Sequence, residues 1–209
     1  MKISYAITVC NELEEIKRLV PIILENKQIE DEIVILYDQK NGDEAVLDYL
    51  LPMNIKPHVQ TWRGMSFDNN FADWKNKLDE YCTGDFVFQL DADEYITKDL
   101  VVNLPQIIES NPQTDLFVFP RINTVEGITG PHLTKWGWNI NDKGWVNFPD
   151  RQGRLYRKGL KWEGKVHERL TGAKYYSLIP EDEILCIHHP KTIERQEKQN
   201  NFYNSIINS

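Results

Sequence analysis

Hydrophobic and polar positions follow two different periods in the first half of the chain, and the pattern predicts alternating strands and helices. Short apolar runs at 3–9, 32–37, 56–62 and 85–90 are typical of buried strands. Between them, apolar residues recur at helical spacing and predict helices at 12–25, 43–51 and 69–81. Pro21 falls inside the first helix and is expected to kink or shorten it. Strands separated by helices favour a mainly parallel sheet.

The second half of the chain loses this regularity after Pro105. Short strands are predicted at 116–121, 154–157, 165–170 and 183–187, and a polar helix at 192–207. Residues 122–150 are rich in Gly, Trp, Asn and Pro. This stretch is long for a structureless connection, so we expect it to form a functional loop or acceptor lid.

Length and composition favour one compact domain without a membrane span. The chain has 209 residues, of which 41% are hydrophobic, and no apolar run is long enough to cross a bilayer. The first ten residues match a short buried strand rather than a signal peptide. The cysteines are few and scattered, without CxxC spacing, which predicts reduced thiols and a cytoplasmic location.

The net charge of −8 is unevenly distributed. Residues 1–118 contain 22 acidic and 10 basic side chains, whereas residues 143–174 contain 3 acidic and 9 basic ones. A basic stretch in an acidic protein can mark the place where an anion is bound. An ordinary solvated surface explains the charge alone equally well.

Polar side chains follow three predicted strands at the point where each strand ends. They are Asn11, Asp38 and the pair Asp91 and Asp93. In parallel sheets, ligands bind beyond the carboxyl ends of the strands. Asp91 and Asp93 are two residues apart, so on an extended chain they point to the same side, and hard oxygen ligands suit Mg²⁺ or Mn²⁺. The pattern predicts a metal–diphosphate site.

Several motifs in this order resemble glycosyltransferase family 2, whose members have the GT-A fold. The resemblance covers nearly the whole chain and rests on segments 7–12, 37–38, 69–76, 90–94, 149–156, 164–168 and 187–189. The most specific combination is Asp-Ala-Asp-Glu after an apolar strand, followed by Arg-Leu-Tyr-Arg and Val-His-Glu. The resemblance implies an α/β fold. Its GT-A (Rossmann-like) central sheet is mostly parallel with flanking helices, and a small C-terminal β-hairpin forms an acceptor subregion.

The same resemblance implies an inverting, metal-dependent transfer of a sugar from a nucleotide-diphosphate donor to an acceptor hydroxyl, with a UDP-sugar expected as donor. It divides the single domain into a nucleotide-sugar-binding half (1–105), an acceptor and catalytic half (106–190) and a C-terminal helix (191–209). A cation on the phosphates stabilises the leaving group, and a carboxylate deprotonates the incoming hydroxyl.

Donor-binding roles are implied for residues from both halves of the chain. Asn11 also fits a helix N-cap, Lys75 an exposed helical lysine, and Arg154 a surface hairpin. Asp38 is expected to contact the base, although the turn after it departs from the family's usual pattern. The complete donor-binding set is Thr8, Asn11, Glu12, Asp38, Lys75, Asp91 and Arg154.

The resemblance implies Mn²⁺ or Mg²⁺ bound by Asp91, Asp93 and one histidine near the end of the chain. His188 and His189 alternate faces, so only one can point into the site, and His188 is predicted; His167 is a further candidate. Asp150 and Glu168 are both candidates for the general base, with Asp150 slightly favoured by analogy. Glu94 is expected to support the loop or to face the acceptor.

The acceptor is left open by the sequence: a saccharide, a glycolipid, a protein side chain or modified viral DNA. The basic stretch 143–174 favours DNA, whereas the net acidity opposes broad DNA binding. Trp136, Trp138 and Trp145 are expected either to stack on sugars or bases or to cover a small core. Two alternatives of another class are a nucleotidyltransferase, for which a glycine-rich phosphate loop is missing near the first strand, and a non-catalytic nucleotide-sugar-binding module.

Overall fold

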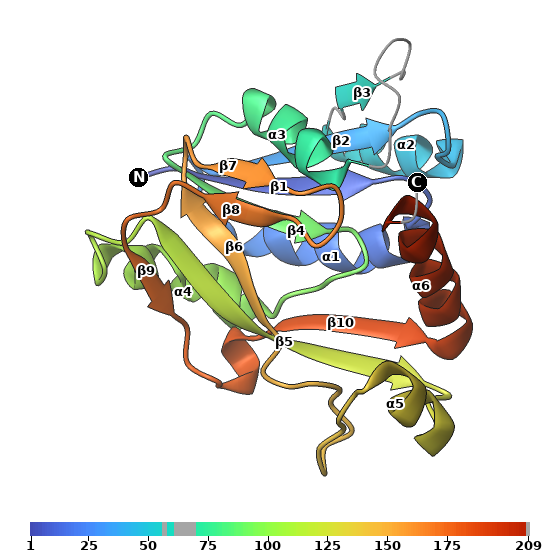
Figure 1. Cartoon of the computed structure of the whole chain (residues 1–209). Helices are drawn as coiled ribbons and strands as arrows, with labels where there is room; N and C mark the ends of the chain where they lie inside the picture. The colour runs from blue at the N-terminus through green and yellow to red at the C-terminus, as the bar shows by residue number, and fades with distance from the viewer. Residues whose placement is uncertain (56–57, 61–69, 208–209) are drawn as a thin grey trace.

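The computed structural model describes residues 1–55, 58–60 and 70–207, and it alternates strands and helices as far as β4 (Figure 1). The first part comprises β1 (Ile3–Val9), α1 (Leu13–Asn26), β2 (Glu32–Asp38), α2 (Glu44–Leu50), the 3-10 helix η1 (Leu51–Met53), β3 (His58–Gln60), α3 (Phe71–Tyr81) and β4 (Phe86–Asp91). The second part comprises α4 (Lys98–Glu109), β5 (Leu116–Glu126), α5 (Gly130–Trp136), β6 (Arg151–Arg157), β7 (Lys161–Glu163), β8 (Arg169–Thr171), β9 (Tyr176–Leu178), η2 (Glu183–Leu185), β10 (Ile187–Thr192) and α6 (Ile193–Ile207).

The central sheet is mostly parallel, which confirms the predicted fold class. Its strands run in the order β10-β5-β6-β4-β1-β2-β3, and β9 pairs with the first part of β5. Only β6 runs antiparallel to its neighbours, β4 and β5. The register places Thr8 of β1 opposite Asp91 of β4, so the carboxyl ends of these strands meet at one edge of the sheet. The predicted small hairpin is the antiparallel pair β7–β8.

The alternation of residues in β1 explains the two layers of the core. Ile3, Tyr5 and Ile7 point to the face covered by α1 and α4, while Ala6 points to the face covered by α3. The β7–β8 hairpin adds Trp162 to the α3 side. Both faces of the sheet are therefore buried, as expected when helices cover a parallel sheet. No helix in the described part of the chain has the length and apolar content needed to cross a bilayer.

Two sequence predictions of secondary structure are wrong, and the shortening expected of Pro21 does not occur. The predicted strand at 165–170 is mainly a turn, in which Gly164 and His167 have positive φ values of 103° and 55°, and β8 starts only at Arg169. The predicted strand at 183–187 contains η2, and β10 begins at its last residue. Pro21 does not shorten α1, which continues to Asn26.

Other boundaries extend or complete the predicted pattern. Helix α4 was not predicted; the Thr97 hydroxyl caps it by accepting a 3.0 Å hydrogen bond from the Leu100 amide. Strand β5 continues beyond the predicted end at 121 to Glu126, and the predicted terminal helix is confirmed as α6. Both ends of the strand predicted at 56–62, and residue 69 of the helix predicted at 69–81, lie outside the described residues.

Candidate functional site

A cleft of about 1690 Å³ opens at the carboxyl ends of β1, β2 and β4 and is bounded on other sides by α3, β5, β6, β10 and α6. Ten of the eleven residues predicted from sequence line it. They are Thr8, Asn11, Glu12, Asp38, Lys75, Asp91, Asp93, Asp150, Arg154 and Glu168. Residues from both halves of the chain therefore meet in one cavity.

The turn after β1 is held by the carboxylate of Glu12. Glu12 Oε2 accepts hydrogen bonds from the amides of Cys10 and Asn11, at 2.8 and 3.0 Å. Burial raises the pKa of Glu12, although these amides and Arg195 oppose the change. The alternative interpretation of Asn11 as a helix cap is wrong, because the N-cap position of α1 is Glu12 and no side chain caps it. Asn11 is exposed at the edge of the cleft.

Asp38 ends β2 and organises the polar turn that follows. Its Oδ1 accepts from the amide of Lys40 at 3.0 Å, and its Oδ2 accepts from Asn41 Nδ2 at 2.8 Å. Gly42 is required here, since a Cβ at this position would lie 2.3 Å from the Asp38 carbonyl oxygen. The turn therefore presents Asp38, Lys40 and Asn41 to the cleft beside the end of β1.

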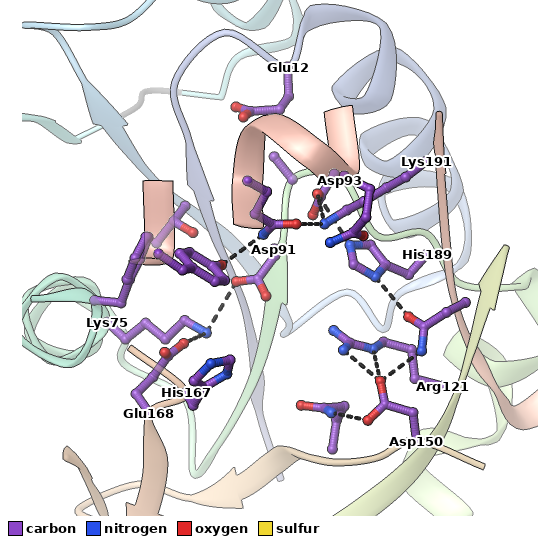
Figure 2. A pocket seen from close by; sticks show the side chains of 18 of the residues that line it. Glu12, Lys75, Asp91, Asp93, Arg121, Asp150, His167, Glu168, His189 and Lys191 are labelled. Atoms are coloured by element: carbon purple, nitrogen blue, oxygen red, sulfur yellow. Dashed lines mark hydrogen bonds and ion pairs between the residues drawn. The ribbon is translucent and has the colours of Figure 1, made fainter. Parts of the chain in front are cut away.

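Asp91 lies between two cationic side chains from different elements. Lys75 Nζ of α3 is 3.2 Å from Oδ1 (Figure 2). Arg154 Nη2 of β6 is 2.6 Å from Oδ2. Burial alone would raise the pKa of Asp91, but these two cations hold it well below its usual range. Asp91 is therefore an anion with both oxygens engaged by protein cations.

Asp93 lies on the neighbouring side of the same turn and has a different set of partners. His189 Nε2 is 3.2 Å from its Oδ2, while Lys191 Nζ and Arg195 NH2 are at 3.5 and 3.6 Å. His189 and Lys191 lower the pKa of Asp93 against the effect of burial. The two aspartates thus divide the cations of the cleft between them.

The orientation of the His189 ring is set by Asn123. Asn123 Nδ2 donates to Asp150 Oδ2 at 2.8 Å, so its Oδ1 faces His189 Nδ1, at 2.9 Å, as an acceptor. Nδ1 then carries the proton, and a neutral ring presents the lone pair of Nε2 to Asp93. A lone pair facing a carboxylate is unfavourable unless a proton or a metal cation lies between them.

The donor set at Asp93 fits a divalent ion that also binds phosphate. One carboxylate and one imidazole are available, and no group of three or more His, Cys, Asp or Glu side chains suited to a metal occurs in the described ranges. Mg²⁺ is usually bound through one or two carboxylates, with substrate phosphates and water as its other ligands. Asp93 and His189 match this incomplete set. Asp91 matches it less well, because its oxygens are already engaged by Lys75 and Arg154.

The predicted metal ligand His188 does not line the cleft. Its ring stacks on Tyr95 with centroids 4.7 Å apart, and its Nε2 is buried without a hydrogen-bond partner in the described part of the chain. Strand β10 pairs with β5 so that His188 lies opposite Ile122 and His189 opposite Asn123. The structure therefore places His189, rather than His188, beside Asp93.

Asp150 is held by more donors than any other carboxylate described above. Arg121 donates to its Oδ2 through Nε at 2.9 Å and Nη2 at 2.6 Å, and Gln152 donates to Oδ1 at 2.9 Å. With the Asn123 bond, these donors outweigh burial and lower the pKa of Asp150. Both oxygens of this carboxylate are occupied.

Within the described residues, Lys75 is the one ion-pair partner of Glu168, and the turn that carries Glu168 is tightly bent. Its Oε1 lies 2.6 Å from Lys75 Nζ, and its Oε2 has no partner in the ranges that the structure describes. The turn is anchored to α3, because the Phe71 amide donates to the Lys165 carbonyl at 2.9 Å. Lys75 thus connects Glu168 to Asp91 (Figure 2).

A buried ion cluster behind the cleft supports these side chains. Glu94, which is fully buried, binds Arg154 at 2.6 Å and Arg121 at 3.0 Å. The expectation that Glu94 supports the loop is confirmed by its 3.1 Å hydrogen bond from the Asp91 amide. Sequence reasoning missed the residues that complete the site. These residues are Arg121, Asn123, Lys191 and Arg195, of which only the last lies in a predicted helix.

Comparison with known proteins agrees with this architecture. No protein-family model matches the chain, and no curated protein matches it by sequence. Among solved structures, Staphylococcus aureus TarS 1–349 superposes with a TM-score of 0.60 at 14% identity over 91% of this chain. Structures of TarS 1–349 with UDP and with UDP-GlcNAc also give a TM-score of 0.60, at 15% and 16% identity.

These neighbours share the mostly parallel sheet with flanking helices that is described above. The fold is that of GT-A glycosyltransferases. The chain spans about 60% of the length of TarS 1–349.

Proposed function

We propose that the chain is an inverting, metal-dependent glycosyltransferase that moves a sugar from a nucleotide-diphosphate donor, a UDP-sugar, to an acceptor hydroxyl. The observation that carries the proposal is the grouping of Asp93, His189, Lys191 and Arg195 where β4 ends. It is supported by the GT-A fold and by the TarS structures that contain UDP and UDP-GlcNAc.

The charges around Asp93 suit a diphosphate. Lys191 and Arg195 lie 3.5 and 3.6 Å from Asp93, longer than a well-formed hydrogen bond, so phosphate oxygens could compete with Asp93 for both cations. Asp93 and His189 would hold the divalent ion. When bound, the ion neutralises the charge that develops on the leaving diphosphate.

The turns after β1 and β2 would hold the nucleoside. Asn11 and Asp38 lie there on the cleft wall, and Thr8 pairs in register with Asp91. The polar turn at 38–42 provides carboxylate and amide groups that can recognise a base edge and ribose hydroxyls. These groups sit at the place where ligands bind in open parallel sheets.

Glu168 is the better candidate for the general base. A base must accept a proton, and Glu168 Oε2 has no donor among the described residues, whereas donors bind both oxygens of Asp150. Lys75 fixes the other oxygen of Glu168 and links it to Asp91. Asp150 would instead orient Arg121 and Asn123.

A test by NMR spectroscopy follows the anomeric signals of UDP-sugars incubated with the chain and Mn²⁺. We expect one donor to transfer its sugar to an added acceptor, or slowly to water, and to release UDP. The transferred sugar should have the inverted anomeric configuration. The release should disappear in Asp93→Ala. Failure of every UDP-sugar to react, or an unchanged rate in Asp93→Ala, would overturn the proposal.

A further inference from the structure

A row of aromatic side chains lies on the surface at the end of the molecule where β5 and β10 end. It comprises His132, Trp136 and Trp138, from α5 and the residues after it. His132 stacks on Trp136 with ring centroids 5.3 Å apart, and Trp136 contacts Trp138 at 4.7 Å. No residue of α5 is buried, and none of these rings belongs to the two core clusters of the described residues. Figure 1 shows α5 beside the end of β5, outside the body of the sheet.

Trp138 belongs both to this aromatic row and to the lining of the cleft. Gly137, with a φ of 65°, ends α5 and turns the chain, and the Trp138 amide donates to the Leu133 carbonyl at 2.9 Å. Trp138 lines the same cavity as Asn147 and Asp150. Its indole Nε1 has no hydrogen-bond partner among the residues described, so the ring offers the cleft both an apolar face and a free donor.

The loop that carries these groups is fixed by its own hydrogen bonds. The amide of Asn139 donates to Asn147 Oδ1, and the amide of Asn147 donates to the Asn139 carbonyl, both at 2.9 Å. The Val146 amide then donates to the Asn123 carbonyl at 2.9 Å and ties the loop to β5. Asn147 Nδ2 keeps a free donor beside Trp138, within the part of the chain that is described. A site with its groups already in place loses little entropy on binding.

Charge decides which ligand suits this surface. Residues 122–149 contain two acidic and two basic side chains, so the loop has no net charge to neutralise a phosphate chain. Several of the basic residues at 143–174 already form ion pairs with acidic residues of the same chain. The paired residues are Lys143 with Glu183, Arg151 with Glu181, Arg154 with Asp91 and Glu94, and Arg157 with Asp115.

From this geometry we propose that Trp136, Trp138 and Asn147 form an acceptor subsite for a neutral saccharide. The proposal rests on the proposed glycosyltransferase function and names its acceptor class. The apolar face of a sugar ring stacks on Trp138, and Asn147 Nδ2 and the indole N–H donate to its hydroxyls. Trp136 extends the platform away from the cleft, so a second sugar unit adds to the affinity.

The test uses the full chain with UDP and Mn²⁺ on an oligosaccharide array that carries neutral, carboxylated and sulfated glycans. A short fluorescent DNA duplex is titrated in parallel. We expect binding to neutral glycans, weakened about tenfold or more in Trp138→Ala and less in Trp138→Phe. Tyr176→Ala, which removes an exposed ring on β9, is the matched control and should bind as the unmodified chain does.

Calorimetry with UDP on the same samples separates the two proposals and verifies that the variants are folded. If UDP binds and no neutral glycan does, or if binding survives in Trp138→Ala, the subsite is wrong while the glycosyltransferase proposal stands. Binding of only the duplex or of anionic glycans would likewise overturn the subsite. If neither UDP nor any glycan binds, both proposals fail.

Discussion

His189 Nε2 lies 3.2 Å from Asp93 Oδ2, although the two residues are 96 positions apart in the chain. The contact joins the turn after β4 to β10, on the side of the sheet where the strands end. Asn123 accepts from the other nitrogen of the ring, so that in a neutral ring the Nε2 lone pair faces the carboxylate. This relationship makes Asp93 and His189 the strongest candidates for metal ligands and leads to the first prediction.

Replacement of Asn123 by alanine should weaken Mn²⁺ binding in the presence of UDP by about 10–100-fold, because the His189 ring loses the acceptor that sets its tautomer. Titration calorimetry measures the affinity. The control is Asn103→Ala on α4, which removes an amide that donates to the Asp99 carbonyl. Equal Mn²⁺ affinity in the two variants would show that Asn123 does not position His189.

Glu168→Gln should lower the rate of sugar transfer by about 10²–10⁴-fold while donor affinity changes little, since the variant loses the proposed base and Lys75 keeps Asp91 as a partner. Asp150→Asn should retain more activity. Initial rates of UDP release, with donor affinities measured on the same proteins, decide between the two carboxylates. A larger loss of rate in Asp150→Asn would assign the base to Asp150 instead.

Arg154→Met should reduce the free energy of unfolding by about 3–5 kcal/mol, because the buried carboxylate of Glu94 and that of Asp91 lose their shared cation. Arg157→Met, on the same strand, removes an exposed arginine that lies 3.5 Å from Asp115 and should cost less than about 1 kcal/mol. Urea unfolding followed by circular dichroism measures both. Similar losses in the two variants would contradict the supporting role assigned to the buried cluster.

The fold should also show a pH dependence that originates from Asp79. Burial raises the pKa of its carboxyl to about 6, although the Tyr156 hydroxyl, which donates at 2.7 Å, opposes the shift. In the unfolded chain an aspartate has a pKa of about 3.9. At pH values between these two pKa values, Asp79 is therefore protonated in the folded chain and ionised in the unfolded chain. The stability that the protonated carboxyl contributes is lost as the pH rises through about 6.

Near pH 8, Asp79→Asn should consequently have a free energy of unfolding about 1–3 kcal/mol higher than that of the unmodified chain. This gain in stability should vanish below about pH 4. Urea unfolding at the two pH values measures the difference. Asp48→Asn on α2, an exposed carboxylate, should change the free energy of unfolding by less than about 0.5 kcal/mol. A gain for Asp79→Asn that is equal at both pH values would exclude titration of Asp79 as its cause.

Much of the architecture where β1, β2 and β4 end could be predicted from sequence, because its signals are local. The period of two in β1 and the apolar runs of β2 and β4 mark buried strands, and carboxylates directly after them must lie at one edge of a parallel sheet. The positions of Asp38, Asp91 and Asp93 at this edge could therefore be predicted. The residues of β5 that complete the cleft carry no such signal, since Arg121 is the last residue of the predicted strand and Asn123 lies beyond its predicted end.

The error at His188 has a physical cause. Alternation predicts that one of two adjacent histidines faces the cleft, but the phase is set by the pairing of β10 with β5, which local sequence does not encode. The strand predicted at 165–170 is wrong for a related reason. Val166 looks like a strand residue, yet the positive φ of Gly164 and His167 folds the backbone so that Glu168 reaches Lys75.

The most direct test of the central claim is calorimetric titration of UDP-sugars into the full chain, with Mn²⁺ and then with EDTA. The account predicts that at least one UDP-sugar binds with Mn²⁺, that EDTA weakens binding about tenfold or more, and that Asp93→Ala abolishes the metal-dependent part. The matched variant Asp99→Ala, at the exposed start of α4, should bind normally. Absence of binding for every UDP-sugar, or binding that neither EDTA nor Asp93→Ala changes, would contradict the account.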